Sequence, residues 1–376
     1  MTKALFGTDG IRGLAGRYPL DPATVRRAAA AAVGLLAGRS SGAPFFLARD
    51  TRASGLWIRD IILREAGRLG VPVADCGVLP TPAAAHLIPA RAGCGGVVIS
   101  ASHNPAADNG LKFLDGRGLK LADADEAAVA AEIRQAEQAA AVDAGVLDAL
   151  PPDSSPDFTV TPELLAMGIS GRRKPLPKDA FEADPEMLER YLRHLLGGAE
   201  ADDPPKGPPV VVDCAQGAAA PVAKVLAQWL PHRLLPIHAS PDGYNINDGC
   251  GATHPEALVA AVWQHRAPLG FALDGDGDRI VAVGPEGRIL DGDALLYIFA
   301  NHLHGEGRLP GPAVVGTVMT NLGLEIALAR RGIRLVRTPV GDRHIQARLL
   351  ADGLALGGEP SGHIILARRC HRQEPT

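Results

Sequence analysis

Short apolar runs alternate with helical patterns along this chain, and this alternation limits the possible folds more than any other feature. Between residues 44 and 100 the run PFFLA precedes a helical pattern from about Ser54 to Leu69. After it come the run VPVADCG, a second helical pattern that follows Thr81, and the run GGVVIS. Strands that alternate with helices in this way predict parallel strands joined by crossover helices, so we expect an α/β protein.

The same alternation recurs twice further along the chain. The runs VVVD, RLLPIHA and LGFALD form one set, and AVVGTVMT, RLVRTPV and LALGG form another, each with helical patterns between the runs. A Pro-rich and charged stretch, which carries PPDSSPD and RRKPLPKD, separates the first set from the second. Because 376 residues are too many for one ordinary hydrophobic core, we expect three successive α/β modules.

Composition excludes several classes of protein. Hydrophobic residues make up 46% of the chain and charged residues 21%, which is typical of a globular protein. A net charge of -4 gives no basic surface for nucleic acid and no polybasic membrane anchor. The start MTKALFGTDG has no apolar leader segment, so we expect a cytoplasmic protein whose partners are small molecules. The five cysteines are scattered and form no CxxC pair, so we expect incidental or buried thiols.

An acidic segment directly follows the apolar run LGFAL. It places Asp274, Asp276 and Asp278 at alternate positions, separated by glycines and followed by Arg279. Three carboxylates on a loop that glycine allows to curl can converge on one hard cation such as Mg²⁺. The alternatives are a solvated acidic turn and a calcium loop of the EF-hand type. The calcium loop is excluded because it needs glycine at its sixth position and glutamate at its twelfth, and here those positions hold Arg279 and Pro285.

A serine-containing loop follows the apolar run GGVVI. Ser102 lies in SASHNP, and a serine at the carboxyl end of a strand is well placed as a nucleophile or phosphate carrier. The alternative is that this segment only forms the turn that Pro105 enforces. A serine hydrolase is disfavoured because GxSxG is absent, and nucleotide binding is disfavoured because Walker A and GxGxxG motifs are absent.

Taken together, these motifs resemble those of the α-D-phosphohexomutases. FGTDGIRG (6–13), SASHNP (100–105) with DNGLKF (108–113), DGDGDR (274–279) and GEPSGH (358–363) occur in the family's order. The opening motif, PDGYNIND (241–248) and VGDR (340–343) are similar to the phosphoglucosamine mutase branch. This resemblance implies mixed sheets around a shared cleft and the interconversion of glucosamine 6-phosphate and glucosamine 1-phosphate through a bisphosphate intermediate.

The resemblance also implies roles for individual residues. Ser102 would carry the phosphoryl group and, with the three aspartates of DGDGDR, would hold Mg²⁺. No other cofactor is implied. The catalytic residues would be Ser102, Lys112, His363 and Arg12, and the metal ligands Ser102, Asp274, Asp276 and Asp278. The residues that would bind the sugar phosphate are Arg279, Gly341, Asp342, Arg343, Glu359 and Ser361.

The modules can now be given boundaries. We expect domain I with the phosphoserine loop over 1–145, a Pro-rich linker or insertion over 146–185, domain II with the metal loop over 186–288, domain III with the sugar loop over 289–367 and an irregular tail over 368–376.

The sequence departs from the family at several places, among them Gln216, which stands where the family usually has asparagine. Pro360 stands where the branch usually has glutamine, and the family's fourth domain, with its R-x-SGTEP loop, has no counterpart in the sequence given. We expect that without this domain the cleft would stay open on one side and activity would be low. The alternatives are a catalytically dead fragment that binds metal or sugar phosphate, a phosphoglucomutase or phosphomannomutase, and a phosphatase of the haloacid dehalogenase type. The serine motif argues against the last, and the sequence does not indicate the oligomeric state.

Overall fold

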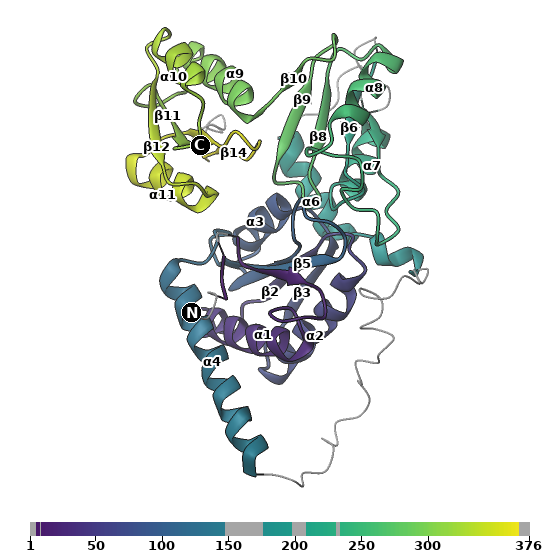
Figure 1. Cartoon of the computed structure of the whole chain (residues 1–376), viewed down its shortest axis with the longest axis vertical. Helices are drawn as coiled ribbons and strands as arrows, with labels where there is room; N and C mark the ends of the chain where they lie inside the picture. Colours follow the sequence, from purple (N-terminus) through teal and green to yellow (C-terminus); the bar gives the residue numbers. More distant parts are fainter. Residues whose placement is uncertain (1–4, 8, 147–175, 198–207, 231–233, 368–376) are drawn as a thin grey trace. The chain divides into compact units, whose positions relative to one another are not determined.

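The computed structural model describes residues 5–7, 9–146, 176–197, 208–230 and 234–367 (Figure 1). It consists of two compact units. The first comprises Met1–Glu200, Gln216–Val222 and Ser240–Asp248, and the second comprises Ala201–Ala215, Ala223–Ala239 and Gly249–Thr376. The predicted tail over 368–376 and residues 147–175 of the predicted linker lie outside the described residues.

The first unit contains a mixed five-stranded sheet in the order β1-β5-β4-β2-β3. Parallel pairing joins β2 to both β3 and β4, as the strand–helix alternation predicted. The antiparallel pairing of β5 with β4 and β1 was not predicted from the alternation, because DNGLKF was interpreted as a motif and not as a strand. The strands are β1 (Ile11–Leu14), β2 (Phe45–Arg49), β3 (Val73–Val78), β4 (Gly95–Ile99) and β5 (Asp108–Asp115).

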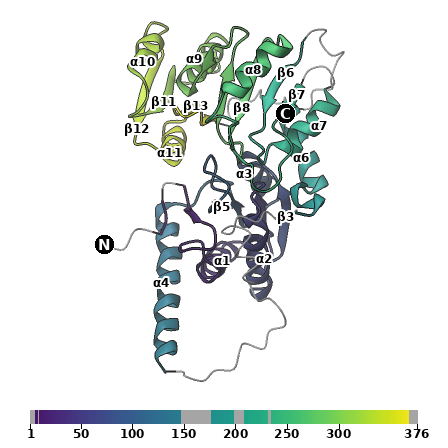
Figure 2. The ribbon, with the colours of Figure 1, turned by 45° about the vertical axis from the view of Figure 1, so that its right-hand side comes forward.

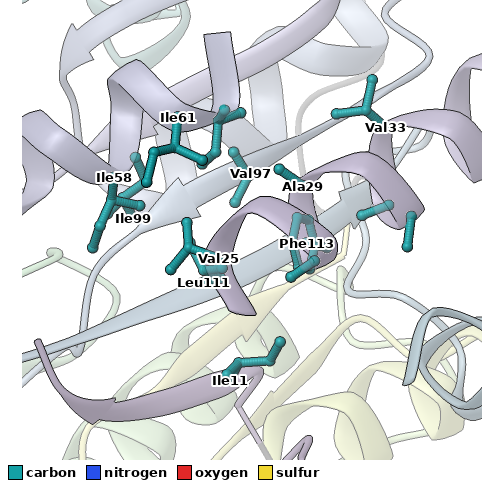
Figure 3. Close-up of a cluster of buried hydrophobic side chains, with 14 of the residues drawn as sticks. Ile11, Val25, Ala29, Val33, Ile58, Ile61, Val97, Ile99, Leu111 and Phe113 are labelled. Atoms are coloured by element: carbon teal, nitrogen blue, oxygen red, sulfur yellow. The ribbon is translucent and has the colours of Figure 1, made fainter. Parts of the chain in front are cut away.

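Helices bury both faces of this sheet. Residues of α1 (Pro22–Ala37), α2 (Ser54–Arg68) and α4 (Asp123–Val146) form one hydrophobic core with β1, β2, β4 and β5 (Figure 3). The helix α3 (Thr81–Ala90) packs against β2 and β4. Asp21 caps the first turn of α1, because its carboxylate accepts the backbone N–H of Thr24 at 3.0 Å.

The end of the predicted linker packs onto the first unit. Residues 178–181 form the short 3-10 helix η1 (Lys178–Phe181). The backbone carbonyl of Glu182 accepts the N–H of Val78, the last residue of the edge strand β3, at 2.9 Å. The helix α6 (Pro185–Leu196) follows and contacts α3. Residues 176–196 therefore belong to the same compact unit as the first sheet.

A second mixed sheet lies in the second unit, in the order β10-β9-β8-β6-β7. β6, β7 and β8 are parallel, while β9 and β10 are antiparallel additions. Val211, Ala272 and Val283 of the sheet pack with Leu258 and Val262 of the helix α8. The elements are β6 (Val210–Asp213), α7 (Ala220–Trp229), β7 (Leu234–Ile237), α8 (Glu256–His265), β8 (Gly270–Leu273), β9 (Ile280–Val283) and β10 (Ile289–Leu290).

The second unit also holds a four-stranded sheet in the order β12-β11-β13-β14. Successive residues of β11 point to opposite faces, so Val314 packs with α9 and α10, and Val315 packs with α11. The helices α9 and α10 thus lie on one side of this sheet and α11 on the other (Figure 2). The elements are α9 (Gly292–Gly305), β11 (Ala313–Thr317), α10 (Leu322–Ala329), β12 (Arg334–Thr338), α11 (Asp342–Asp352), β13 (Leu356–Gly358) and β14 (Ile364–Leu366).

These sheets confirm three successive α/β modules with mixed sheets in the described part of the chain. None of the described helices is long and apolar enough to cross a membrane. The described cysteines Cys76, Cys94, Cys214 and Cys250 are buried, as expected, and form no disulfide with one another, while Cys370 lies outside the described residues. Burial raises the pKa of the Cys214 thiol to about 12, and neighbouring Asp213 adds to the shift.

Candidate active site

Ser102 lies in a loop that a buried hydrogen-bond network holds at the carboxyl end of β4. The hydroxyl of Ser100 donates to the Asp50 carboxylate at 2.5 Å and accepts the backbone N–H of Ser102 at 2.9 Å. Asp50 directly follows β2, the parallel neighbour of β4, so the ends of two strands meet here. The hydroxyl of Ser102 lies 3.3 Å from Nδ1 of His103. This edge of a parallel sheet is where α/β proteins bind ligands.

Two buried side chains clamp the backbone of the serine loop. Arg52 donates to the carbonyls of Ser102 at 3.2 Å and Asn104 at 2.5 Å, and it pairs with the Asp50 carboxylate. The Asn247 amide donates to the same two carbonyls at 2.9 and 3.1 Å. Ser102 has a φ of +54°, a conformation that a non-glycine residue adopts only when its surroundings impose it. The clamp therefore imposes the position of Ser102.

Arg12 and Lys112 lie beside this loop in the same unit. Arg12 donates to the carbonyl of Ala101 at 3.2 Å, one residue before Ser102. The Lys112 ammonium lies 3.1 Å from the Asp9 carboxylate, which also contacts Arg12 and Lys120. The antiparallel pairing of β1 with β5 brings these residues together, because Arg12 is opposite Gly110. Three of the predicted catalytic residues, Ser102, Arg12 and Lys112, are therefore neighbours.

The acidic loop follows β8 in the second unit. Gly277, with a φ of +66°, turns the backbone so that the N–H groups of Asp278 and Arg279 donate back to the Asp274 carboxylate, each at 3.2 Å. Carboxylate oxygens of Asp274, Asp276 and Asp278 all lie within 4.8 Å of one another. Asp274 and Asp276 are fully buried.

This donor set fits a hard divalent cation. Buried carboxylates at such short separations repel one another, and a bound cation offsets both that repulsion and the cost of burial. All three offered donors are oxygens, which is the chemistry that Mg²⁺ and Ca²⁺ prefer. The segment is therefore a candidate metal site.

The loop between β13 and β14 carries the predicted sugar-binding residues. The Glu359 carboxylate accepts the backbone N–H of Gly341 at 2.9 Å and lies 3.4 Å from the Ser361 hydroxyl. His363 lies between two acidic groups, with Nδ1 3.8 Å from Asp278 and Nε2 3.6 Å from Asp342. The sugar loop, the VGDR segment and the acidic loop therefore converge within the second unit.

Gly362 explains how the sugar loop approaches the acidic loop. Its carbonyl accepts the backbone N–H of Ile280 at 3.0 Å, two residues after Asp278, and its φ is +93°. A Cβ at this position would lie 2.2 Å from the carbonyl oxygen of Ile280, so only glycine fits. Pro360 retains a backbone role, because its carbonyl accepts the N–H of Gly292 at 3.1 Å.

Every predicted site residue lies in the described part of the chain, in two groups that belong to different units. Ser102, Arg12 and Lys112 form the first group. In the second group, Arg279 directly follows Asp278 in the acidic loop, and Arg343 directly follows Asp342 in the first turn of α11. The sequence analysis missed the residues that hold the serine loop. Asp50 could have been recognised, because it directly follows a predicted strand, at the end where parallel sheets bind ligands. The missed residues are Asp9, Asp50, Arg52, Ser100 and Asn247.

Replacement of Asn247 by alanine is expected to lower phosphoryl transfer through Ser102 by about tenfold to a hundredfold. The change removes the hydrogen bonds from Asn247 to the carbonyls of Ser102 and Asn104, which costs about 1–3 kcal/mol. Only Arg52 then still donates to these two carbonyls. Transfer is measured as the rate at which Ser102 gains phosphate from glucose 1,6-bisphosphate. Asp248→Ala, an exposed neighbour, is the matched control. An unchanged rate in Asn247→Ala would show that Arg52 alone positions the loop.

Three family models match the chain in order. They describe phosphoglucomutase/phosphomannomutase alpha/beta/alpha domain I over residues 3–140, domain II over 189–287 and domain III over 291–374. A solved phosphoglucomutase/phosphomannomutase family protein from Burkholderia thailandensis has a TM-score of 0.73 at 24% identity, covering 98% of this chain and 73% of that one. At this identity the likeness shows the fold alone.

Curated relatives give the more specific comparison. A phosphoglucosamine mutase from Desulforudis audaxviator is 41% identical over 362 residues, which is 96% of this chain and 73% of the relative. One from Pelotomaculum thermopropionicum is 42% identical over 361 residues, 96% of this chain and 74% of the relative. The chain therefore belongs to the phosphoglucosamine mutases, within the phosphoglucomutase/phosphomannomutase family.

Proposed function

We propose that this protein interconverts glucosamine 6-phosphate and glucosamine 1-phosphate, with Ser102 as the phosphoryl carrier and Mg²⁺ held by Asp274, Asp276 and Asp278. The observation that carries this proposal is the fixed position of Ser102, which two buried side chains clamp at the carboxyl end of β4. A merely structural turn would not need a strained serine held by a buried arginine and a buried asparagine.

The chemistry proceeds in two half-reactions of opposite direction. In the first, the bond between phosphorus and the Ser102 Oγ breaks, and a bond forms from phosphorus to the free hydroxyl of the sugar monophosphate. The hydroxyl proton leaves to a base, and the Ser102 oxygen regains a proton, which produces free serine and a sugar bisphosphate. In the second, the serine takes the phosphoryl group from the other end of the bisphosphate, and a monophosphate of the opposite isomer is released.

Residues of both units have roles in this proposal. Lys112 and His363 are the candidates to take up and return the proton, and Arg12 beside the serine loop places positive charge near the transferring group. Glu359 and Ser361 would accept and donate hydrogen bonds to sugar hydroxyls. Gly341, Asp342, Arg343 and Arg279 would contact the remaining part of the sugar phosphate. A bound Mg²⁺ would neutralise charge on the transferring phosphoryl oxygens.

The test is an assay of the protein with glucosamine 6-phosphate, Mg²⁺ and a catalytic amount of glucose 1,6-bisphosphate, followed by phosphorus NMR. We expect glucosamine 1-phosphate to form and Ser102 to carry phosphate by mass spectrometry. Preference for glucose or mannose phosphates would instead indicate a phosphoglucomutase or a phosphomannomutase. Release of inorganic phosphate without isomerisation would indicate a phosphatase, and absence of phosphate on Ser102 would indicate a catalytically dead protein.

A further inference from the structure

Three chemically distinct metal-binding side chains meet in the second unit, and none of them belongs to the acidic loop. Asp213 is the last residue of β6, and His238 directly follows β7, the parallel neighbour of β6. Cys250 comes from the loop before α8. Donor atoms of these three side chains all lie within 4.8 Å of one another.

The Asp213 carboxylate is a fixed member of this group. One oxygen accepts the backbone N–H of Ala215 at 2.9 Å, and the other accepts the N–H of Gly251 at 3.0 Å. The second bond ties β6 to the loop that carries Cys250. Gly251 has a φ of +76°, and a Cβ there would lie 2.5 Å from the Cβ of Ala215, so this close approach requires glycine. The carboxylate and the Cys250 loop are thus held in one arrangement.

His238 is held in the same group by a strained backbone. Its φ is +46°, in the left-handed region that residues other than glycine adopt uncommonly. Its Nδ1 is buried and lies 3.0 Å from the Asp213 carboxylate, yet among the described residues it makes no hydrogen bond of acceptable geometry. A buried polar atom without a hydrogen bond calls for an explanation, and a bound ion is one that suits an imidazole nitrogen.

The donor set distinguishes this group from the acidic loop. A thiol, an imidazole and a carboxylate together form a set that zinc favours, usually with water in the fourth tetrahedral position. The three oxygen donors of the acidic loop suit harder cations such as Mg²⁺. Cys250 and Asp213 are buried, while the His238 side chain is 31% exposed and gives the ion a route from solvent.

We propose that Asp213, His238 and Cys250 form a second divalent-cation site that binds Zn²⁺. Binding forms one bond each from the metal to sulfur, nitrogen and oxygen, and it displaces the thiol proton of Cys250 to solvent. The ion would join the ends of β6 and β7 to the loop before α8. Because the ion would bind only the folded protein, it would raise thermal stability.

The test uses Co²⁺ as a probe of the site, because a cobalt–thiolate bond produces a characteristic absorption that oxygen ligands cannot produce. We expect this absorption in the wild-type protein and its displacement by Zn²⁺. Cys250→Ser should abolish it, and His238→Gly should weaken Zn²⁺ binding at least about tenfold. The glycine variant also relieves the strained φ of residue 238, so it tests the ligand without endangering the fold.

Two control variants locate the signal. Asp276→Asn, which alters the acidic loop, should leave the cobalt–thiolate absorption unchanged. Cys214→Ser, which removes a buried thiol close to Asp213, should also leave it unchanged. The proposal is overturned if the wild type gives no thiolate absorption, or if the absorption persists in Cys250→Ser. A Zn²⁺-dependent rise in melting temperature that is equal in wild type and His238→Gly would also overturn it.

Discussion

Replacing Ser102 with alanine is expected to lower phosphoryl transfer by at least roughly a thousandfold while leaving Mg²⁺ binding weakened but detectable. The transfer needs an oxygen that can form and break a bond to phosphorus, and alanine offers none. The three carboxylates of the acidic loop remain, so the metal keeps its protein ligands. Rates of phosphate exchange between the protein and glucose 1,6-bisphosphate measure the first effect, and calorimetric titration with Mg²⁺ measures the second.

Two comparison variants separate the loss of the hydroxyl from a disturbed loop. Ser102→Gly removes the hydroxyl but relieves the φ of +54°, so it should be as inactive as the alanine variant even though its backbone is unstrained. Ser100→Ala keeps the Ser102 hydroxyl and removes only its support at Asp50, so a partial loss is expected. Wild-type exchange in either Ser102 variant would remove this residue from the mechanism.

Much of the fold could be predicted because its signals are local. Each parallel strand is a short apolar run, and each crossover helix has its own periodicity, so α2 and α3 begin where the sequence indicated. The cap of α1 is equally local, since Asp21 lies three residues before the N–H that it accepts. The antiparallel strand β5 was missed because polar motif residues, which function requires, mask its alternation.

The candidate site could be predicted from the sequence only where the residues that act together lie in one short segment. Asp274, Asp276 and Asp278 form a pattern within five residues, so the acidic loop could be recognised directly. The clamp on Ser102 could not, because Asn247 is 145 residues away from it in the sequence. A lone arginine or asparagine carries no sign of its partner, and only the folded chain brings such residues together. The Asp213, His238 and Cys250 group was missed for the same reason.

Changing Asp276 to asparagine is expected to weaken Mg²⁺ binding at least about tenfold and to slow phosphoryl transfer in parallel. The substitution keeps the shape of the side chain but removes one formal charge and one strong ligand from a group of three carboxylates, in which Asp276 itself is fully buried. Calorimetry with Mg²⁺ and the exchange rate of phosphate on Ser102 provide the two measurements. A loss of both is expected only if the acidic loop binds the metal that the transfer uses.

A second measurement on the same variant tests the electrostatic argument without any activity assay. In metal-free protein the three closely spaced carboxylates, two of them buried, repel one another, so neutralising one of them should leave the melting temperature unchanged or raise it. Mg²⁺ should raise the melting temperature of the wild type, because it binds the folded state, and this rise should largely vanish in Asp276→Asn. Glu286→Gln, which alters an exposed carboxylate in the turn between β9 and β10, should keep the full rise. If Asp276→Asn instead keeps wild-type affinity and the full rise, the acidic loop is a solvated turn and the cation must bind elsewhere.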